Sequence, residues 1–302
     1  MRIRFAKMHG AGNDFVLIDD RDGSFPCEQS ILSAIGARGT GVGCEGIILV
    51  QRSERLDFRM KFFNPDGSEA ELCGNGARCV AAFAREIGAV KSDVMRFETL
   101  AGDVGAEIVG PGLVRVEMPD PKDLRTDFVN SGVPHRIVPV EDLAAVDVAG
   151  EGRRIRYSAE FAPAGTNVDF VTYRAPHDVS IRTYERGVEA ETGACGTGSV
   201  AAALVGVAQH GLAFPVTVRT VRGFELAIGG SFDGRAFHSV TLTGPVAHVF
   251  TGEIDLDAFS KTPCGNVLKN LQIPPCAAHV ICDILSPRSP ERGNARSLTV
   301  GG

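Results

Sequence analysis

The residues at 69–76 read EAELCGNG, and those at 189–198 read EAETGACGTG. Each stretch ends in Cys-Gly-x-Gly and is followed by small apolar residues with the periodicity of a helix. The repeat predicts an α+β protein with two pseudo-symmetric halves, each a mostly antiparallel sheet wrapped around a central helix. Cys73 and Cys195 would stand at the starts of the two helices. We therefore expect the active site in the cleft between the halves.

The remaining patterns divide the chain into an N-terminal half (1–118), a C-terminal half (119–254) and a peripheral or partly disordered tail (255–302). Gly-rich and Pro-rich turns separate the expected elements. Helices are expected at 30–37, 76–87 and 199–209. Strands are expected at 3–5, 15–18, 46–51, 56–63, 94–99, 104–109 and 113–118 in the first half, and at 136–140, 154–161, 168–173, 216–220, 224–228 and 237–242 in the second.

Composition excludes several classes of protein. The chain has 302 residues, of which 44% are hydrophobic and 23% charged, as in soluble globular proteins. Its net charge of -6 does not favour a nucleic-acid-binding surface. The start of the chain lacks the apolar core of a secretory signal, and no apolar run is long enough to span a membrane. We expect a cytoplasmic protein with neither a nucleic-acid nor a membrane partner.

The number of cysteines is interpreted for a cytoplasmic protein, in which disulfides are rare. Eight cysteines in a cytoplasmic chain are not a disulfide framework. Cys27, Cys44 and Cys79 are expected to be buried small hydrophobic residues. The group Cys276, His279 and Cys282 has poor spacing for a metal and no obvious fourth ligand, so no metal site is predicted.

Cys73 and Cys195 point to acid–base chemistry. A cysteine at a helix N-terminus lies beside unpaired backbone N–H groups and the positive end of the helix dipole, which lower the thiol pKa toward the working pH. The same N–H groups can hold a carboxylate. An α-amino acid bound between two such loops could lose its Cα proton to one sulfur and receive a proton from the other. A single Cys-Gly-x-Gly is equally typical of a tight turn, but duplication in matching contexts favours the site.

Further candidates are polar residues in turns or near the cysteine loops. Asn13, Asn64 and Asn167 each lie at a glycine-rich or turn position, where asparagine is often structural. Glu185 and Arg186 could supply an acid–base partner and a carboxylate clamp, although alone they would be typical of a surface ion pair. Another candidate, His135, could tune a thiol.

Together these motifs resemble diaminopimelate epimerase over residues 1 to about 255. The matching pieces are KMHGAGNDF at 7–15, FNPDGSEAELCGNGARC at 63–79, GTNVDFV at 165–171, YERG at 184–187 and ACGTG at 194–198. The resemblance implies that LL-2,6-diaminopimelate is epimerised to the meso form without a cofactor, in the synthesis of lysine and peptidoglycan precursors. It also implies a homodimer whose catalytic cysteines can oxidise to an inactive disulfide.

The resemblance also assigns roles to residues. Cys73 and Cys195 would be the two proton carriers, with Cys73 serving the L centre, and His135 and Glu185 would adjust their pKa values. Gly74, Asn75, Gly196 and Thr197 would hold the reacting carboxylate. The rest of the substrate would be bound by Asn13, Asn64, Asn167, Glu185 and Arg186.

Three departures from the family pattern leave alternatives open. Many members have Asn where Val133 stands, so one contact would be lost or supplied by Asn130. Many have Leu where Gly193 stands, and the loop at 43–46 also differs. A related amino-acid racemase without pyridoxal phosphate, acting on another substrate, is therefore an alternative. A second alternative is a thiol redox or binding protein.

Overall fold

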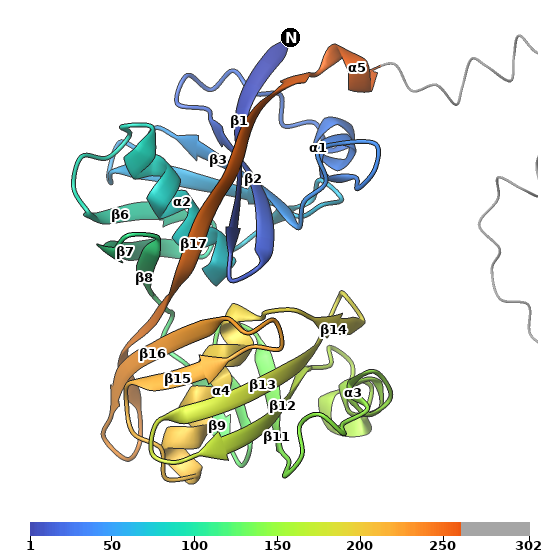
Figure 1. Ribbon diagram of the computed structural model, residues 1–302, viewed down its shortest axis with the longest axis vertical. Coiled ribbons are helices and arrows are strands. Elements are labelled where there is room, and N and C mark those ends of the chain that lie inside the picture. Colours follow the sequence, from blue (N-terminus) through green and yellow to red (C-terminus); the bar gives the residue numbers. More distant parts are fainter. Residues whose placement is uncertain (261–302) are drawn as a thin grey trace, which may run out of the picture. The chain divides into compact units, whose positions relative to one another are not determined.

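The computed structural model describes residues 1–260, and Met1–Phe259 form one compact unit (Figure 1). The part of the expected tail from residue 261 onward, with Cys276, His279 and Cys282, lies outside the described residues. Among the described residues, no helix is long and apolar enough to cross a membrane.

The first half is a closed ring of strands around one helix. Its strands pair in the order β1, β2, β3, β4, β6, β7, β8 and β17, and β17 pairs back with β1. The helix is α2 (Gly74–Glu86). The strands are β1 (Arg2–Gly10), β2 (Asn13–Asp19), β3 (Gly46–Gln51), β4 (Phe58–Phe63), β6 (Val94–Thr99), β7 (Gly102–Gly110), β8 (Leu113–Glu117) and β17 (Phe237–Asp255).

The second half is a similar sheet around α4 (Gly196–Gln209). Its strands pair in the order β9, β10, β11, β12, β13, β15, β16 and β17. They are β9 (Lys122–Arg125), β10 (Phe128–Asn130), β11 (Pro134–Pro139), β12 (Asn167–Arg174), β13 (Asp178–Glu185), β15 (Val216–Arg219) and β16 (Glu225–Phe232).

The two halves repeat each other strand by strand. From β1 to β8, and again from β10 to β17, the first pair is antiparallel, the second is parallel and the third is antiparallel. The fourth strand of each half then pairs antiparallel with a short strand, β5 (Glu69–Ala70) or β14 (Ala190–Thr192), and parallel with the sixth. Helix α1 (Gln29–Gly36) occupies the same place in the order as α3 (Val148–Arg156). The predicted α+β fold of two similar halves is confirmed.

Strand β17 belongs to both halves, so the halves are not simply 1–118 followed by 119–254. Residues 241–245 pair with β8, and residues 246–255 pair with β1 (Figure 1). The last strand of the second half thereby closes the ring of the first. The pattern at 237–242 predicted only the beginning of this strand.

Helices α2 and α4 are enclosed because their side chains are small and apolar. Ala77, Ala81, Ala201 and Ala203 are buried in one continuous core cluster. Helix α4 is apolar on nearly all sides and is therefore covered by its sheet, whereas α2 also buries the polar Asn75 and Arg78 and leaves Arg85 and Glu86 exposed at its C-terminal end. The N-terminal ends of both helices open toward the same cavity, described below.

Two predictions about local structure are wrong. The strand expected at 154–161 is the end of α3 followed by a short 3-10 helix, η1 (Ala159–Phe161). Asp147 caps α3 by accepting a hydrogen bond from the Gly150 N–H at 3.0 Å. Three arginines in the last turn stabilise the helix further, because their positive charges lie at the negative end of its dipole. Cys44 and Cys79 are buried as expected, whereas Cys27 is exposed.

Candidate active site

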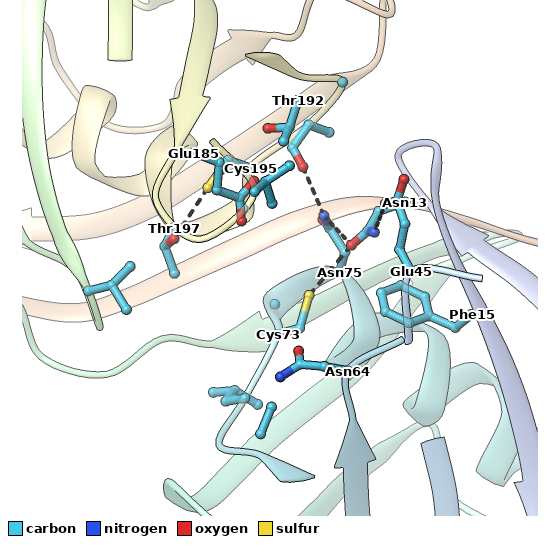
Figure 2. Close-up of a pocket in the computed structure, with 18 of the residues that line it drawn as sticks. Asn13, Phe15, Glu45, Asn64, Cys73, Asn75, Glu185, Thr192, Cys195 and Thr197 are labelled. Atoms are coloured by element: carbon cyan, nitrogen blue, oxygen red, sulfur yellow. Dashed lines mark hydrogen bonds between the residues drawn. The ribbon is translucent and has the colours of Figure 1, made fainter. Parts of the chain in front are cut away.

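A cavity of about 560 Å³ lies between the two cysteine loops (Figure 2). Its walls come from both halves, and they contain most of the residues expected in the site. Those residues are Asn13, Asn64, Cys73, Gly74, Asn75, Glu185, Cys195, Gly196 and Thr197. His135, Asn167 and Arg186 are not among the lining residues.

Each cysteine is the residue immediately before its helix. Cys73 precedes α2 and Cys195 precedes α4, and both have extended backbone angles typical of an N-cap. The Cys195 sulfur accepts a hydrogen bond from the Gly198 N–H at 3.4 Å. The helices therefore begin earlier than the expected 76 and 199, and the first-turn residues Gly74, Asn75, Gly196 and Thr197 line the cavity. Their N–H groups are suited to hold a carboxylate.

The expectation that the thiol pKa values are lowered needs correction. Burial raises the pKa of Cys73 above its ordinary value, and the N–H groups of Gly76 and Asn75 only partly oppose this effect. Burial also raises the pKa of Cys195, with the charges of Glu185 and Asp169 adding to the increase. The helix terminus favours the thiolate, but removing the sulfur from water disfavours it more.

The Cys73 thiol belongs to a polar network that reaches the opposite loop. It donates to the Asn13 Oδ1 atom at 3.5 Å, and the Asn75 amide donates to the same oxygen at 3.2 Å (Figure 2). The Asn75 amide also lies 3.5 Å from the carbonyl oxygen of Ala194, next to Cys195. Asn13 in turn donates to Glu45. The loop at 43–46, whose sequence differs from the family pattern, therefore supplies part of the wall of the site.

A buried cation lies behind Cys73. Arg78 is 0% exposed, and it donates to the carbonyl of Gly74 at 3.2 Å and to the Asn75 Oδ1 atom at 2.8 Å. Its Nε atom has no hydrogen-bond partner among the described residues, and none of their carboxylates forms an ion pair with it. A Cβ atom at Gly244 would lie 3.1 Å from the guanidinium carbon. Glycine there leaves the space that the guanidinium occupies.

Arg78 makes the two cysteines electrostatically different. Its charge favours the Cys73 thiolate, although burial and the charge of Glu185 both raise the Cys73 pKa more than Arg78 lowers it. Burial raises the pKa of the neighbouring Cys79 to about 12, so Cys79 stays neutral and does not compensate the cation. The residue at the same position of α4 is the apolar Val200.

Cys195 is instead connected to a buried histidine. The Cys195 sulfur lies 3.5 Å from the Thr197 hydroxyl, which lies 3.0 Å from His135 Nε2 (Figure 2 labels the first two). His135 Nδ1 lies 2.6 Å from a carboxylate oxygen of Asp169, and both side chains are 0% exposed. His135 is therefore connected to the thiol through Thr197 rather than by direct contact.

Glu185 lines the cavity beside Cys195, and burial raises the pKa of its carboxyl group. Asn167 supports this segment from behind, because its Oδ1 atom accepts the backbone N–H of Arg186 at 2.7 Å and its amide donates to Pro134. Asn130 does not replace the asparagine missing at Val133. It caps its own turn through the Gly132 N–H at 3.1 Å.

Sequence reasoning missed several polar residues of the site. Arg78 and Asp169 are charged residues inside otherwise apolar segments, a pattern that could have marked them as buried and functional. Glu45, Glu191 and Arg222 also line the cavity. Glu191 lies within the quoted repeat at 189–198, but nothing in the sequences around Glu45 and Arg222 marks these two residues, which only the folding of distant loops brings to the cavity. In the described part of the chain, no group of three or more His, Cys, Asp or Glu side chains is placed to hold a metal ion.

Solved structures support the architecture. A Bacillus anthracis phenazine biosynthesis protein of the PhzF family matches with a TM-score of 0.66 and 18% identity, covering 84% of this chain and 99% of that one. A probable proline racemase from Agrobacterium radiobacter K84 matches with a TM-score of 0.63 and 17% identity, covering 90% and 96%. At these identities the likeness shows the fold alone.

Sequence relatives go further. Diaminopimelate epimerase of Aquifex aeolicus is 45% identical over 277 residues, which are 83% of this chain and 98% of that protein. The enzyme of the same name from Chlorobaculum tepidum is 41% identical over 263 residues, covering 82% and 100%. The family model described as Diaminopimelate epimerase matches residues 5–123 and 128–249. Because this match runs through both halves and both cysteine loops, the chain belongs to the diaminopimelate epimerase family, and the resemblance seen in its motifs is confirmed.

Proposed function

We propose that this enzyme interconverts LL-2,6-diaminopimelate and meso-diaminopimelate by a two-cysteine acid–base reaction without a cofactor, in the pathway to lysine and peptidoglycan precursors. The observation that carries the proposal is the placement of Cys73 and Cys195 at matched helix N-termini on opposite sides of one cavity (Figure 2). A cysteine on each side provides what inversion requires, which is a proton acceptor on one face of a carbon and a proton donor on the other.

The reacting carboxylate would be held by the first-turn N–H groups of α2 and α4. Negative charge grows on this carboxylate as the Cα–H bond breaks, and fixed N–H donors stabilise that charge. The Cys73 thiolate takes the Cα proton and becomes a thiol, while the Cys195 thiol gives its proton to the opposite face and becomes a thiolate. The product has the inverted centre, and the proton count of enzyme and substrate is unchanged.

The free thiols are held largely protonated by burial, so the substrate itself has to help activate them. Its α-ammonium group enters the same buried space, and a nearby positive charge favours a thiolate. Asn13, Asn64 and Asn75 line the cavity near Cys73, while Glu45, Glu185 and Glu191 add negative charge to its walls. This lining suits a long, multiply charged amino acid better than a compact apolar one such as proline.

The test is solvent exchange at Cα. Reduced enzyme in D2O with LL-diaminopimelate, and without added metal or cofactor, should incorporate deuterium with inversion, as followed by NMR. Cys73→Ser and Cys195→Ser should each abolish inversion, because each removes one proton carrier, while thermal unfolding stays close to that of the parent enzyme. Inversion at the normal rate in either variant would refute the two-cysteine reaction. Exchange with a different amino acid only would keep the chemistry and discard the substrate.

The resemblance to the family also supports two further proposals, that the enzyme works in the cytoplasm and that it is a homodimer. Sedimentation equilibrium of the full chain tests the second. A single species at the monomer mass of 31.9 kDa, at concentrations where the enzyme is active, would contradict it.

A further inference from the structure

A second hollow, of about 570 Å³, lies on the outside of the second half and is called the outer hollow below. Its floor is the face of β12, β13 and β15 that points away from α4 (Figure 1). Arg174, Ser180 and Arg219 stand on this face, because they alternate with apolar residues that pack in the core around α4. Its rim is the loop at 141–144, which carries Glu141 and Asp142. Among the described residues, none lines both the outer hollow and the cavity between the cysteine loops.

Three charged side chains of the outer hollow, Arg174, Glu141 and Asp142, form no ion pair in the described part of the chain. Arg174 donates to the Ser180 hydroxyl at 3.4 Å, which uses only one of its N–H donors. One oxygen of Asp142 accepts the backbone N–H of Ala144 at 3.0 Å, and the other oxygen stays available. All three charged side chains belong to exposed residues. The outer hollow therefore offers one free guanidinium and two free carboxylates to a ligand.

Arg182 lines the outer hollow and also reaches the loop at 189–195, which carries Cys195 and is called the catalytic loop below. Its Nε and Nη2 atoms donate to the two carboxylate oxygens of Glu191, each at 2.7 Å. Its Nη1 atom donates to the carbonyl oxygens of Leu143 and Val146 at 3.0 and 3.1 Å. Glu191 in turn lines the cavity between the cysteine loops. One side chain thus connects the rim of the outer hollow to the catalytic loop.

We propose that the outer hollow is a second ligand site, which binds a basic amino acid and acts through Arg182 on the catalytic loop. The free charges match a ligand with one carboxylate and two ammonium groups. The Arg174 guanidinium would bind the carboxylate through parallel hydrogen bonds, and Glu141 and Asp142 would each bind an ammonium group. Diaminopimelate has a second carboxylate, and no unpaired cation among the described residues of the outer hollow is left for it, because Arg182 and Arg219 are already in ion pairs.

The coupling follows from the two kinds of contact that the rim makes. Its side chains would face the ligand, while the carbonyl oxygen of Leu143, and that of Val146 just after the rim, hold Arg182. A ligand that draws the rim toward Arg174 also shifts these carbonyls, and with them the guanidinium that fixes Glu191. Such an effect requires that the ligand binds more tightly to the shifted rim than to the resting one.

The binding test titrates the full chain with L-lysine, and with cadaverine, which is lysine without its carboxylate, by isothermal calorimetry. Lysine should bind even with excess meso-diaminopimelate present, because the two sites are separate. Arg174→Gln should weaken lysine binding about 10-fold or more, the effect of losing a charge-assisted pair, and leave cadaverine binding within about 2-fold. Joint replacement by Glu141→Gln and Asp142→Asn should weaken the binding of both ligands.

Arg235→Gln is the matched control, because it removes an exposed arginine from the turn between β16 and β17, outside the outer hollow. It should bind both ligands like the parent enzyme. Three results would overturn the site: no binding of lysine, equal affinity of the parent for lysine and cadaverine, or an unchanged lysine affinity in Arg174→Gln. Displacement of lysine by meso-diaminopimelate would place lysine in the cavity between the cysteine loops and would also overturn the proposal.

The coupling is tested by the rate of meso-diaminopimelate formation. Saturating lysine should lower kcat about 2- to 10-fold in the parent enzyme and leave it unchanged in Arg174→Gln. Arg182→Lys loses the paired donors to Glu191, so it should still bind lysine but lose most of the effect on kcat. Lysine binding without a change in kcat, or a full effect in Arg182→Lys, would overturn the coupling. This kinetic test rests on the proposed function, which would itself be refuted by an enzyme inactive without lysine, whereas the binding of lysine is measured independently of it.

Discussion

Replacing Arg78 with methionine tests whether a buried cation prepares Cys73 to act as the base. The substitution keeps much of the volume of the Arg78 stem and removes the charge. It also removes the donors to the Gly74 carbonyl and to Asn75 Oδ1. The expected result is a higher pKa for Cys73, because the thiolate loses a positive charge that favours it.

The cost in stability follows from the two hydrogen bonds. The Asn75 Oδ1 atom loses its donor, and a buried acceptor without a donor would lower the free energy of unfolding by about 1 to 3 kcal/mol. The Gly74 carbonyl, 3.2 Å from the guanidinium, keeps the backbone N–H of the first helical turn, so its loss costs less.

The assay is the rate of iodoacetamide alkylation of Cys73 against pH, measured by mass spectrometry in a Cys195→Ser background. The midpoint should move to higher pH in Arg78→Met, and Arg78→Lys should bring it back toward that of the parent because it keeps the charge. Arg85→Met is the control, since it removes an exposed cation from the same helix. An unchanged midpoint in a folded Arg78→Met protein would refute the electrostatic role of Arg78.

Two further predictions concern Cys195. Glu185→Gln removes a negative charge that raises the Cys195 pKa. The basic limb of the kcat/KM–pH profile, where this thiol loses its proton, should therefore move to lower pH. A basic limb that stays in place or moves to higher pH would contradict this prediction. Thr197→Val removes the hydroxyl that joins Cys195 to His135 and should lower kcat about 5- to 100-fold, with recovery in Thr197→Ser. Equal loss in valine and serine variants would instead assign Thr197 a packing role.

Much of the fold was predictable because the same sequence pattern occurs in both halves. The two Cys-Gly-x-Gly loops are both followed by small apolar residues, and this pattern gave both central helices and the pseudo-symmetry. What failed was local. Residues 154–161 have alternating polar and apolar positions, which is typical of a strand. The first of them instead end the helix α3, which begins after its N-cap Asp147, outside that window. The continuation of β17 to Asp255 was missed because its partner, β1, lies at the other end of the chain.

The candidate site shows the same division. Lining residues within motifs, such as Asn13 and Asn75, were found because glycines mark their loops. The pKa of the cysteines was misjudged because the effect of a helix N-terminus can be read from sequence, whereas burial depends on the walls that surround the sulfur. Arg222 could not be found from its own segment. Its place in the cavity wall depends on the absence of a side chain at Gly193, in another loop.

A symmetric fold must be made asymmetric for an inversion in one direction to begin with one base and one acid. The repeat places each sulfur at the start of a helix, in the same backbone geometry. The differences lie in the neighbours. Glu185 raises the pKa of both thiols, but Arg78 partly opposes this effect at Cys73, whereas Asp169 adds to it at Cys195. In the resting enzyme, Cys73 should therefore lose its proton more readily than Cys195, so that Cys73 acts as the base and Cys195 as the proton donor. That polarity belongs to the direction in which Cys73 removes the Cα proton, and the reverse reaction must first exchange the two protonation states.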